Sequence, residues 1–113
     1  MQILDETICA ISTAAGVGGI AVIRVSGSHA IAISDKIFKP LKSGKSIAEM
    51  DGNTIQFGRI INNKNEIIDE VLISLFRNPH SFTGEDVVEI GCHGSLFIQQ
   101  EILKLLIENG CSM

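Results

Sequence analysis

The sequence contains no tryptophan and no tyrosine, so phenylalanine is its sole aromatic residue type. Its apolar content is therefore largely aliphatic, and hydrophobic residues (45%) far outnumber charged ones (19%). Such a composition is typical of a globular domain rich in strand-forming residues. A chain of 113 residues is long enough to build one hydrophobic core, and we expect a single domain.

Long apolar runs and basic clusters are also missing. No stretch approaches the roughly eighteen apolar residues that a membrane span requires, and the opening MQILDETICA lacks the basic flank and apolar stretch of a secretion signal. We therefore expect a cytoplasmic protein with no membrane partner. The formal net charge of −4 argues against nucleic-acid binding by this segment alone, because phosphate binding requires clustered Lys and Arg.

Closely paired cysteines are absent as well. Cys9, Cys92 and Cys111 are widely spaced and include no C-x-x-C pair that would indicate zinc or redox chemistry. We expect reduced, mostly buried thiols. The adjacent Cys92 and His93 do not predict a nucleophile with its base, since neighbours on a strand point to opposite faces. We expect a buried Cys92 beside a loop-facing His93, and we assign no catalytic residue and no metal site.

Hydrophobic periodicity predicts five strands and two helices. The expected strands cover residues 2–11, 20–26, 54–61, 67–76 and 86–92. The third and fourth of these should form a hairpin. One helix is expected to start after a Ser28 N-cap and to end at Pro40, and another to start after Ser95 and to end at Gly110. Residues 41–52 show no clear period and are interpreted as a mobile surface connection.

The order of these elements, β-β-α-β-β-β-α, predicts the fold class. It favours an α+β fold with a mixed, largely antiparallel sheet of about five strands and helices packed on one face. The chain stops soon after the helix terminator Gly110, where another strand could begin. We therefore expect residues 1–113 to be one domain excised from a longer protein.

Two patterns resemble nucleotide-binding motifs without their structural context. The run from Gly16 to Ala21 fits a dinucleotide fingerprint, and Asp35 stands at the distance of a ribose-binding acid. The glycines, however, lead into a strand where the fingerprint requires a helix N-terminus. The tripeptide at 44–46 (GKS) resembles the end of a phosphate loop, but Lys39 occupies the position of the required first glycine. We expect neither a dinucleotide site nor a GTP site in this segment.

Three stretches carry a family likeness: DETI from Asp5, GVGGIAVIRVSG from Gly16, and SFTGEDVVEIGCHG from Ser81. In order and spacing they resemble the start of the MnmE (TrmE) family of tRNA modification GTPases. The likeness spans all 113 residues but only the opening portion of the family's chain, without its helical domain, G domain and C-terminal cysteine motif. Departures are modest: a three-residue D-E-T stands where the family often has D-T, and Ser95 where a second glycine commonly follows H-G.

The resemblance implies a GTP-hydrolysing enzyme that, with the flavin-dependent partner MnmG (GidA), adds an aminomethyl-type group to the wobble uridine of certain tRNAs. It further implies GTP with magnesium and potassium in the missing G domain. One carbon would come from a tetrahydrofolate derivative (formyl or methylene). The family's N-terminal domain binds this folate, is similar in fold to the folate-binding domain of aminomethyltransferases, and forms a homodimer.

Arg24 and Glu89 match positions of the family's motifs associated with folate, and each interrupts an apolar strand. A carboxylate can accept two parallel hydrogen bonds from a pterin-like ring, and a guanidinium can fork onto a ligand oxygen. We therefore assign cofactor binding to both, Glu89 to the ring and Arg24 to an oxygen. The loop 16–19 and the 93–94 turn would allow close approach. The alternative interpretation is that both are ordinary half-exposed strand residues.

Two other functions stay open at this point. One is a stand-alone folate-dependent domain of the aminomethyltransferase kind, and the other is a non-enzymatic interaction domain whose sheet supports a partner. A downstream G-x-x-x-x-G-K-[ST] in the reading frame would support the GTPase family. A second folate-type domain would support the transferase.

Overall fold

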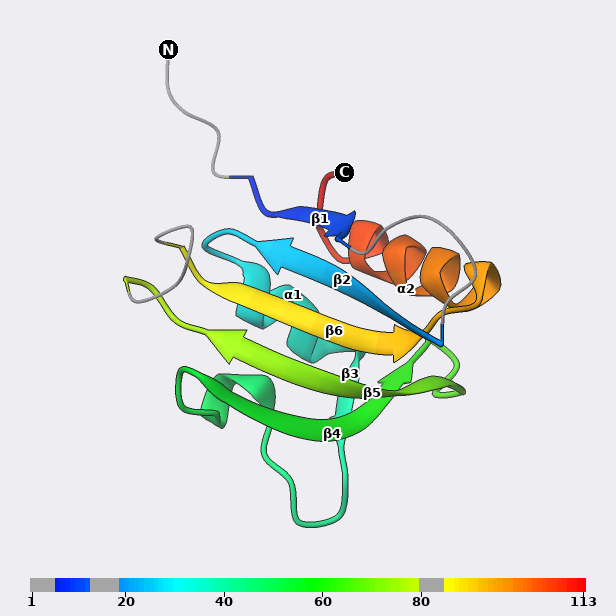
Figure 1. Ribbon diagram of the computed structural model, residues 1–113, viewed down its shortest axis with the longest axis horizontal. Coiled ribbons are helices and arrows are strands. Elements are labelled where there is room, and N and C mark those ends of the chain that lie inside the picture. Colours follow the sequence, from blue (N-terminus) through cyan, green and yellow to red (C-terminus); the bar gives the residue numbers. More distant parts are fainter. Residues whose placement is uncertain (1–5, 13–18, 80–84) are drawn as a thin grey trace.

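The structure, a computed structural model, describes residues 6–12, 19–79 and 85–113 (Figure 1). These residues form six strands, two α-helices and one 3₁₀ helix. The elements are β1 (Ile8–Ile11), β2 (Ile20–Ser26), α1 (Ala30–Ile37), β3 (Phe38–Pro40), η1 (Ile47–Glu49), β4 (Thr54–Ile61), β5 (Ile67–Phe76), β6 (Val87–His93) and α2 (Leu96–Glu108).

The six strands make one sheet in the order β1-β2-β6-β5-β4-β3, and every neighbouring pair is antiparallel. A single parallel bridge, between Ile8 and Ser112, lies outside the named pairs. The predicted α+β class is therefore confirmed, including the hairpin of β4 and β5. The first strand is shorter than expected within the described residues, and β3 is an additional strand.

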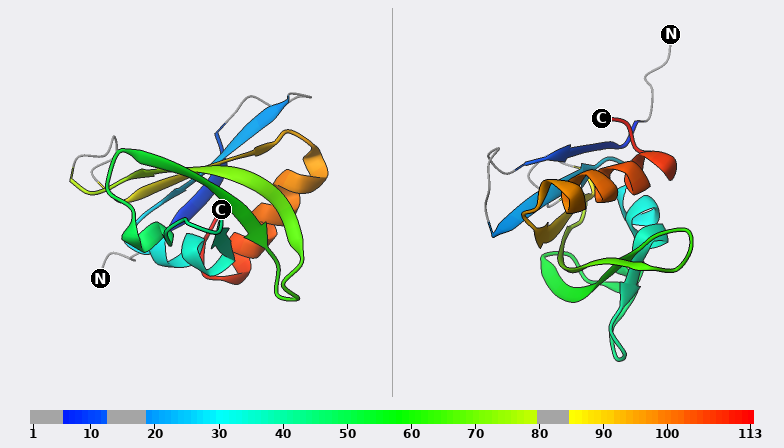
Figure 2. Two further views of the ribbon diagram at one scale, coloured as in Figure 1. Left: turned by 90° about the horizontal axis from the view of Figure 1, so that it is seen from below. Right: turned by 90° about the vertical axis from the view of Figure 1, so that its right-hand side faces the viewer.

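Both helices lie on one face of the sheet, as Figures 1 and 2 show. Alternate residues of the central strands point to this covered face and are fully buried or nearly so. They include Ile23 and Val25 of β2, Val88 and Ile90 of β6, and Val71, Ile73 and Leu75 of β5. No helix covers the opposite face among the described ranges. The intervening residues on that face, here called the open face, are partly or fully exposed, apart from the buried Val87 at the start of β6.

The two α-helices differ in how they begin. Ser95 caps α2 as predicted, because its side chain accepts a hydrogen bond of 3.0 Å from the backbone N–H of Ile98. The predicted Ser28 cap of α1 is wrong. A turn, in which Ala30 N–H bonds to the carbonyl of Gly27, precedes α1 and places Ser28 outside it, so His29 is the N-cap residue.

The segment after α1 is more ordered than its sequence indicates. The helix ends at Ile37, and Phe38–Pro40 pairs with β4 as strand β3. Residues 41–52, expected to be a mobile connection, contain η1 with its fully buried Ile47. Asp35 holds η1 by accepting hydrogen bonds from the backbone N–H groups of Ile47 (2.6 Å) and Ala48 (3.0 Å).

In the part of the chain that the structure describes, neither helix has the length and apolarity to cross a lipid bilayer.

Candidate functional site

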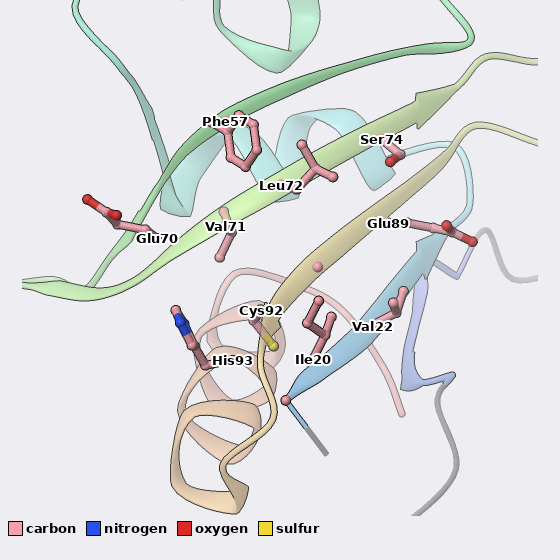
Figure 3. A pocket seen from close by; sticks show the side chains of 12 residues that line it. Ile20, Val22, Phe57, Glu70, Val71, Leu72, Ser74, Glu89, Cys92 and His93 are labelled. Atoms are coloured by element: carbon pink, nitrogen blue, oxygen red, sulfur yellow. The ribbon is translucent and has the colours of Figure 1, made fainter.

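A hollow of about 520 Å³ lies on the open face, across β2, β6, β5 and β4 (Figure 3). Its size falls in the range of small-molecule and cofactor sites, roughly 300–1,000 Å³. Val22, Phe57 and Leu72 supply apolar walls, while Glu89 and His93 supply polar groups. A few polar groups in an apolar concavity are the usual composition of a ligand site.

Gly91 keeps the middle of this hollow open. In the sheet register it lies between Val22 of β2 and Leu72 of β5. A Cβ atom built on Gly91 would meet nothing closer than the Leu72 carbonyl oxygen at 3.5 Å. The strand therefore has room for a side chain here but carries none, so a flat ligand can approach the backbone of β6.

Arg24 and Glu89 form an ion pair at one end of the hollow. They are directly opposite each other in the register of β2 and β6. Arg24 Nε and Nη2 donate hydrogen bonds of 3.1 and 2.7 Å, both to Glu89 Oε2. Their side chains are 41% and 25% exposed. Within the described residues Glu89 Oε1 accepts no hydrogen bond, so it is available to a ligand.

The structure thus brings the two sequence-predicted site residues together, although as partners of each other. A cross-strand ion pair is also an ordinary stabiliser of a sheet, so the contact alone does not establish binding. The pair nevertheless leaves hydrogen-bonding groups unused on both side chains. Glu89 keeps one unused oxygen, and the guanidinium of Arg24 keeps N–H donors beyond the two it spends on Glu89. Of the loop 16–19 expected to allow close approach, only Gly19 is described, and it lines the hollow.

A second polar pair, which the sequence interpretation missed, lies at the other end of the hollow. His93 Nδ1 bonds to Asp69 Oδ1 at 2.7 Å, and the backbone N–H of His93 donates to Asp69 Oδ2 at 2.8 Å. Asp69 is 8% exposed, whereas the His93 side chain is 71% exposed. One signal could have found Asp69: like Glu89, it is a carboxylate that interrupts an apolar strand.

Cys92 is buried, as expected. It is 3% exposed and lies on the covered face, and the neighbouring His93 is exposed. Burial, reinforced by the negative charge of Asp69, raises the pKa of the Cys92 thiol to about 11. A thiol that stays protonated at neutral pH is a poor nucleophile.

The described residues of the nucleotide-like patterns have other places in the fold. Asp35, the candidate ribose ligand, is engaged by the backbone of η1. Ser46 begins η1 and bonds to Glu49, while Lys45 lies in an exposed loop. A strand, β3, lies upstream of this loop where the sequence predicted a helix, but the element that follows the loop is the short 3₁₀ helix η1. The run 13–18, which includes Gly16 and Gly18, lies outside the described residues.

Fold and site together define a class: a small α+β domain whose helix-free sheet face carries a hollow lined by Glu89 at one end and His93 at the other, each bonded to a second polar side chain. The chain belongs to the family described as "GTP-binding protein TrmE N-terminus", whose sequence model matches residues 7–113.

Three relatives of the chain are each named tRNA modification GTPase MnmE. The protein from Parabacteroides distasonis is 61% identical over 106 residues, that from Bacteroides thetaiotaomicron 58% over 109, and that from Lysinibacillus sphaericus 49% over 109. These matches cover 94%, 96% and 96% of this chain. The chain spans only 23% of the length of each relative.

Proposed function

We propose that the hollow binds a tetrahydrofolate derivative carrying one carbon (formyl or methylene), and that this chain is the folate-binding, dimer-forming domain of a tRNA modification GTPase. The observation that carries the proposal is the Arg24–Glu89 pair at the end of an apolar hollow of ligand size. Membership of the TrmE N-terminal family supports it, because the resemblance noted in the sequence implies that Arg24 and Glu89 lie in folate-associated motifs.

The chemistry of the pair suits the ring of such a ligand. A pterin-like ring offers a ring N–H and an exocyclic amine side by side, and Glu89 Oε1 can accept one of these donors directly. Both acceptor positions of Oε2 are filled by Arg24, so two parallel bonds to the ring require Arg24 to release one of its own. The released N–H would then face a ligand oxygen. Phe57 and Leu72 would contact the ring's apolar surface.

The activity of the whole protein extends the proposal. We propose GTP hydrolysis with magnesium and potassium in a separate G domain, and cooperation with the flavin-dependent MnmG (GidA). Together they would add an aminomethyl-type group to the wobble uridine of tRNA in the cytoplasm. The name shared by the relatives, tRNA modification GTPase, supports this role. The chain's own net charge of −4 indicates that tRNA contacts come mainly from elsewhere.

A homodimer is part of the same proposal. Three large apolar side chains of the open face, Ile20, Ile55 and Phe57, are 73%, 63% and 63% exposed. Large exposed apolar side chains on a sheet face without helices are typical of association surfaces, and two-fold dimers are the commonest soluble oligomers. Light scattering at micromolar concentration should give twice the 12.2 kDa chain mass. A strictly monomeric solution over a wide concentration range would contradict this part.

The folate proposal is tested by calorimetric titration of 5-formyltetrahydrofolate into wild type, Glu89→Gln and Arg24→Ala. Loss of a charge-assisted hydrogen-bond partner should weaken binding by about 1.5 to 3 kcal/mol, roughly ten- to hundredfold. Glu108→Gln and Lys104→Ala are matched controls, because both residues are exposed on α2, behind the sheet. Their affinities should equal that of wild type.

Two results would refute the folate site. Either wild type fails to bind the folate at all, or both site variants fold normally and bind it as tightly as wild type. Calorimetry with GTP gives an independent check, because this chain holds no phosphate loop and should not bind GTP. Stoichiometric GTP binding would return attention to Lys45 and Ser46.

A further inference from the structure

The Asp69–His93 pair fixes which nitrogen of the His93 imidazole donates to the carboxylate, at one end of the hollow. A carboxylate can only accept hydrogen bonds, so the 2.7 Å contact requires His93 Nδ1 to donate its proton to Asp69 Oδ1. In a neutral ring the other nitrogen, Nε2, is then left as an acceptor. Asp69 is nearly buried and its second oxygen is held by the His93 backbone, so its carboxylate cannot turn away freely.

We propose that His93 is a second ligand-recognition residue, whose Nε2 accepts a hydrogen bond from an N–H of the bound ligand, and that Asp69 is the positioning residue that keeps Nε2 an acceptor. The proposal rests on the proposed function, since it concerns the same hollow and the same folate. The contact would be made by the part of the folate beyond the pterin ring, which carries an amine and an amide N–H.

The geometry of the hollow supports two separate contacts. Glu89 and His93 lie on the same strand, four residues apart, and so about 13 Å apart along β6. Figure 3 shows them at opposite ends of the hollow, with Val22 and Ile20 along the side between them. A ligand that reaches both must be elongated, with an acceptor-seeking edge at each end. A ring recognised at Glu89 therefore leaves its extension to run toward His93.

A purely structural role would explain less of what is observed. The bond from the His93 backbone N–H to Asp69 Oδ2 completes the end of β6 by itself. The second bond orients an imidazole that is 71% exposed, on the rim of a ligand-sized hollow. Ordering an exposed ring costs side-chain entropy without a matching gain in burial. Preorganising a recognition group accounts for that arrangement.

Asp69→Asn tests the proposal by reversing the tautomer. The His93 backbone N–H still requires an oxygen, so the substituted carboxamide must place its oxygen there and its NH₂ against Nδ1. Nδ1 then accepts, and Nε2 becomes the protonated nitrogen, a donor facing the ligand's own donor. Nitrogen-15 NMR of histidine-labelled protein reads this change without any ligand. We expect Nδ1–H in wild type and Nε2–H in the variant.

Titration with 5-formyltetrahydrofolate gives the second measurement. Two donors facing each other leave both unsatisfied, so Asp69→Asn should weaken binding about tenfold, and His93→Ala should weaken it to a similar extent. Asp35→Asn is the matched control, since Asp35 also accepts two N–H bonds but holds η1 at a distance from the hollow. It should bind as wild type does.

The outcomes separate the two proposals. If Glu89→Gln weakens binding while Asp69→Asn and His93→Ala do not, the recognition role of His93 is wrong and the folate site stands. An Nε2–H tautomer in wild type would overturn it as well. If wild type binds no folate, the proposed function fails and this contact fails with it. Should Asp69→Asn not fold, His93→Ala decides alone: unchanged affinity overturns the proposal.

Discussion

The two faces of the sheet are built by the same strands and yet have opposite characters. On the covered face, alternate residues of β2, β5 and β6 are aliphatic and almost without solvent exposure. On the open face, the intervening residues include an ion pair, an aspartate-supported histidine, a glycine and an exposed phenylalanine. Because side chains alternate along a strand, the core residues point to one face and the candidate binding residues to the other. Glu89 and Ile90, for example, are adjacent and point to different faces.

The largest expected contrast between the faces is in stability. Ile90→Ala should lower the free energy of unfolding by about 2–5 kcal/mol, because it leaves a cavity at a fully buried position. Phe57→Ala, on the open face, should change that of the monomer by less than about 0.5 kcal/mol, because the ring is 63% exposed in the single chain. Urea denaturation measures both. Equal losses of stability would show that the Phe57 ring is packed against another surface.

Two glycines give a second, smaller contrast. A Cβ on Gly58 would lie 2.2 Å from Phe38 Cε1 and 2.8 Å from the Lys39 carbonyl oxygen, so Gly58→Ala should cost about 1–3 kcal/mol by overpacking. Gly91→Ala meets only ordinary contacts and should fold normally. Its methyl group would instead occupy the floor of the hollow and weaken folate binding. Urea denaturation and folate titration of both variants check this. A destabilised Gly91→Ala, or a Gly58→Ala of unchanged stability, would contradict the prediction.

Two buried thiols predict an alkaline loss of stability. Burial raises the pKa of Cys92 to about 11 and that of Cys111 to about 12, from an ordinary value of 9.0. Unfolded thiols therefore ionise first. Their stabilising effect is complete below pH 9 and declines as the pH rises toward 11 or 12.

At pH 10 we expect about 1 kcal/mol less stability for each of these thiols than at pH 8. Urea denaturation under reducing conditions at the two pH values checks this. Cys92→Ala should show a smaller decline than wild type. An identical decline in that variant would mean that Cys92 does not contribute.

The smallest expected effect on folding belongs to the Arg24–Glu89 pair. Both side chains are partly exposed, so solvent screens their attraction, and Arg24→Met should lower stability by less than about 1 kcal/mol. The same variant should lose folate affinity at least tenfold. A large stability loss with unchanged affinity would assign the pair to the scaffold.

Much of the fold could be predicted because its signals are local. The alternation of β2, β4, β5 and β6 and the stripe of α2 are visible in short windows of sequence. The strand β3 was missed because three residues directly after a helix carry no period of their own, and their pairing with β4 decides their conformation. The 3₁₀ helix was missed because its partner, Asp35, belongs to α1.

The site was predictable only in part, for the same reason. A charged residue within an apolar strand singled out Arg24 and Glu89, but their direct pairing depends on a register between strands 65 positions apart. The Asp69–His93 pair joins the end of β6 to β5 across 24 positions. No spacing rule within one element could predict either contact.

The strand order has a consequence for how the molecule assembles. The hairpin of β4 and β5 closes over a few residues, whereas β2 meets β6 only after about sixty intervening residues have been arranged. Closing long loops is entropically slow, so local hairpins form readily and distant pairings limit the folding rate. The hollow straddles the β2–β6 seam. It therefore exists only once that slow step is complete, and a partly folded chain with its local hairpin in place has no ligand site.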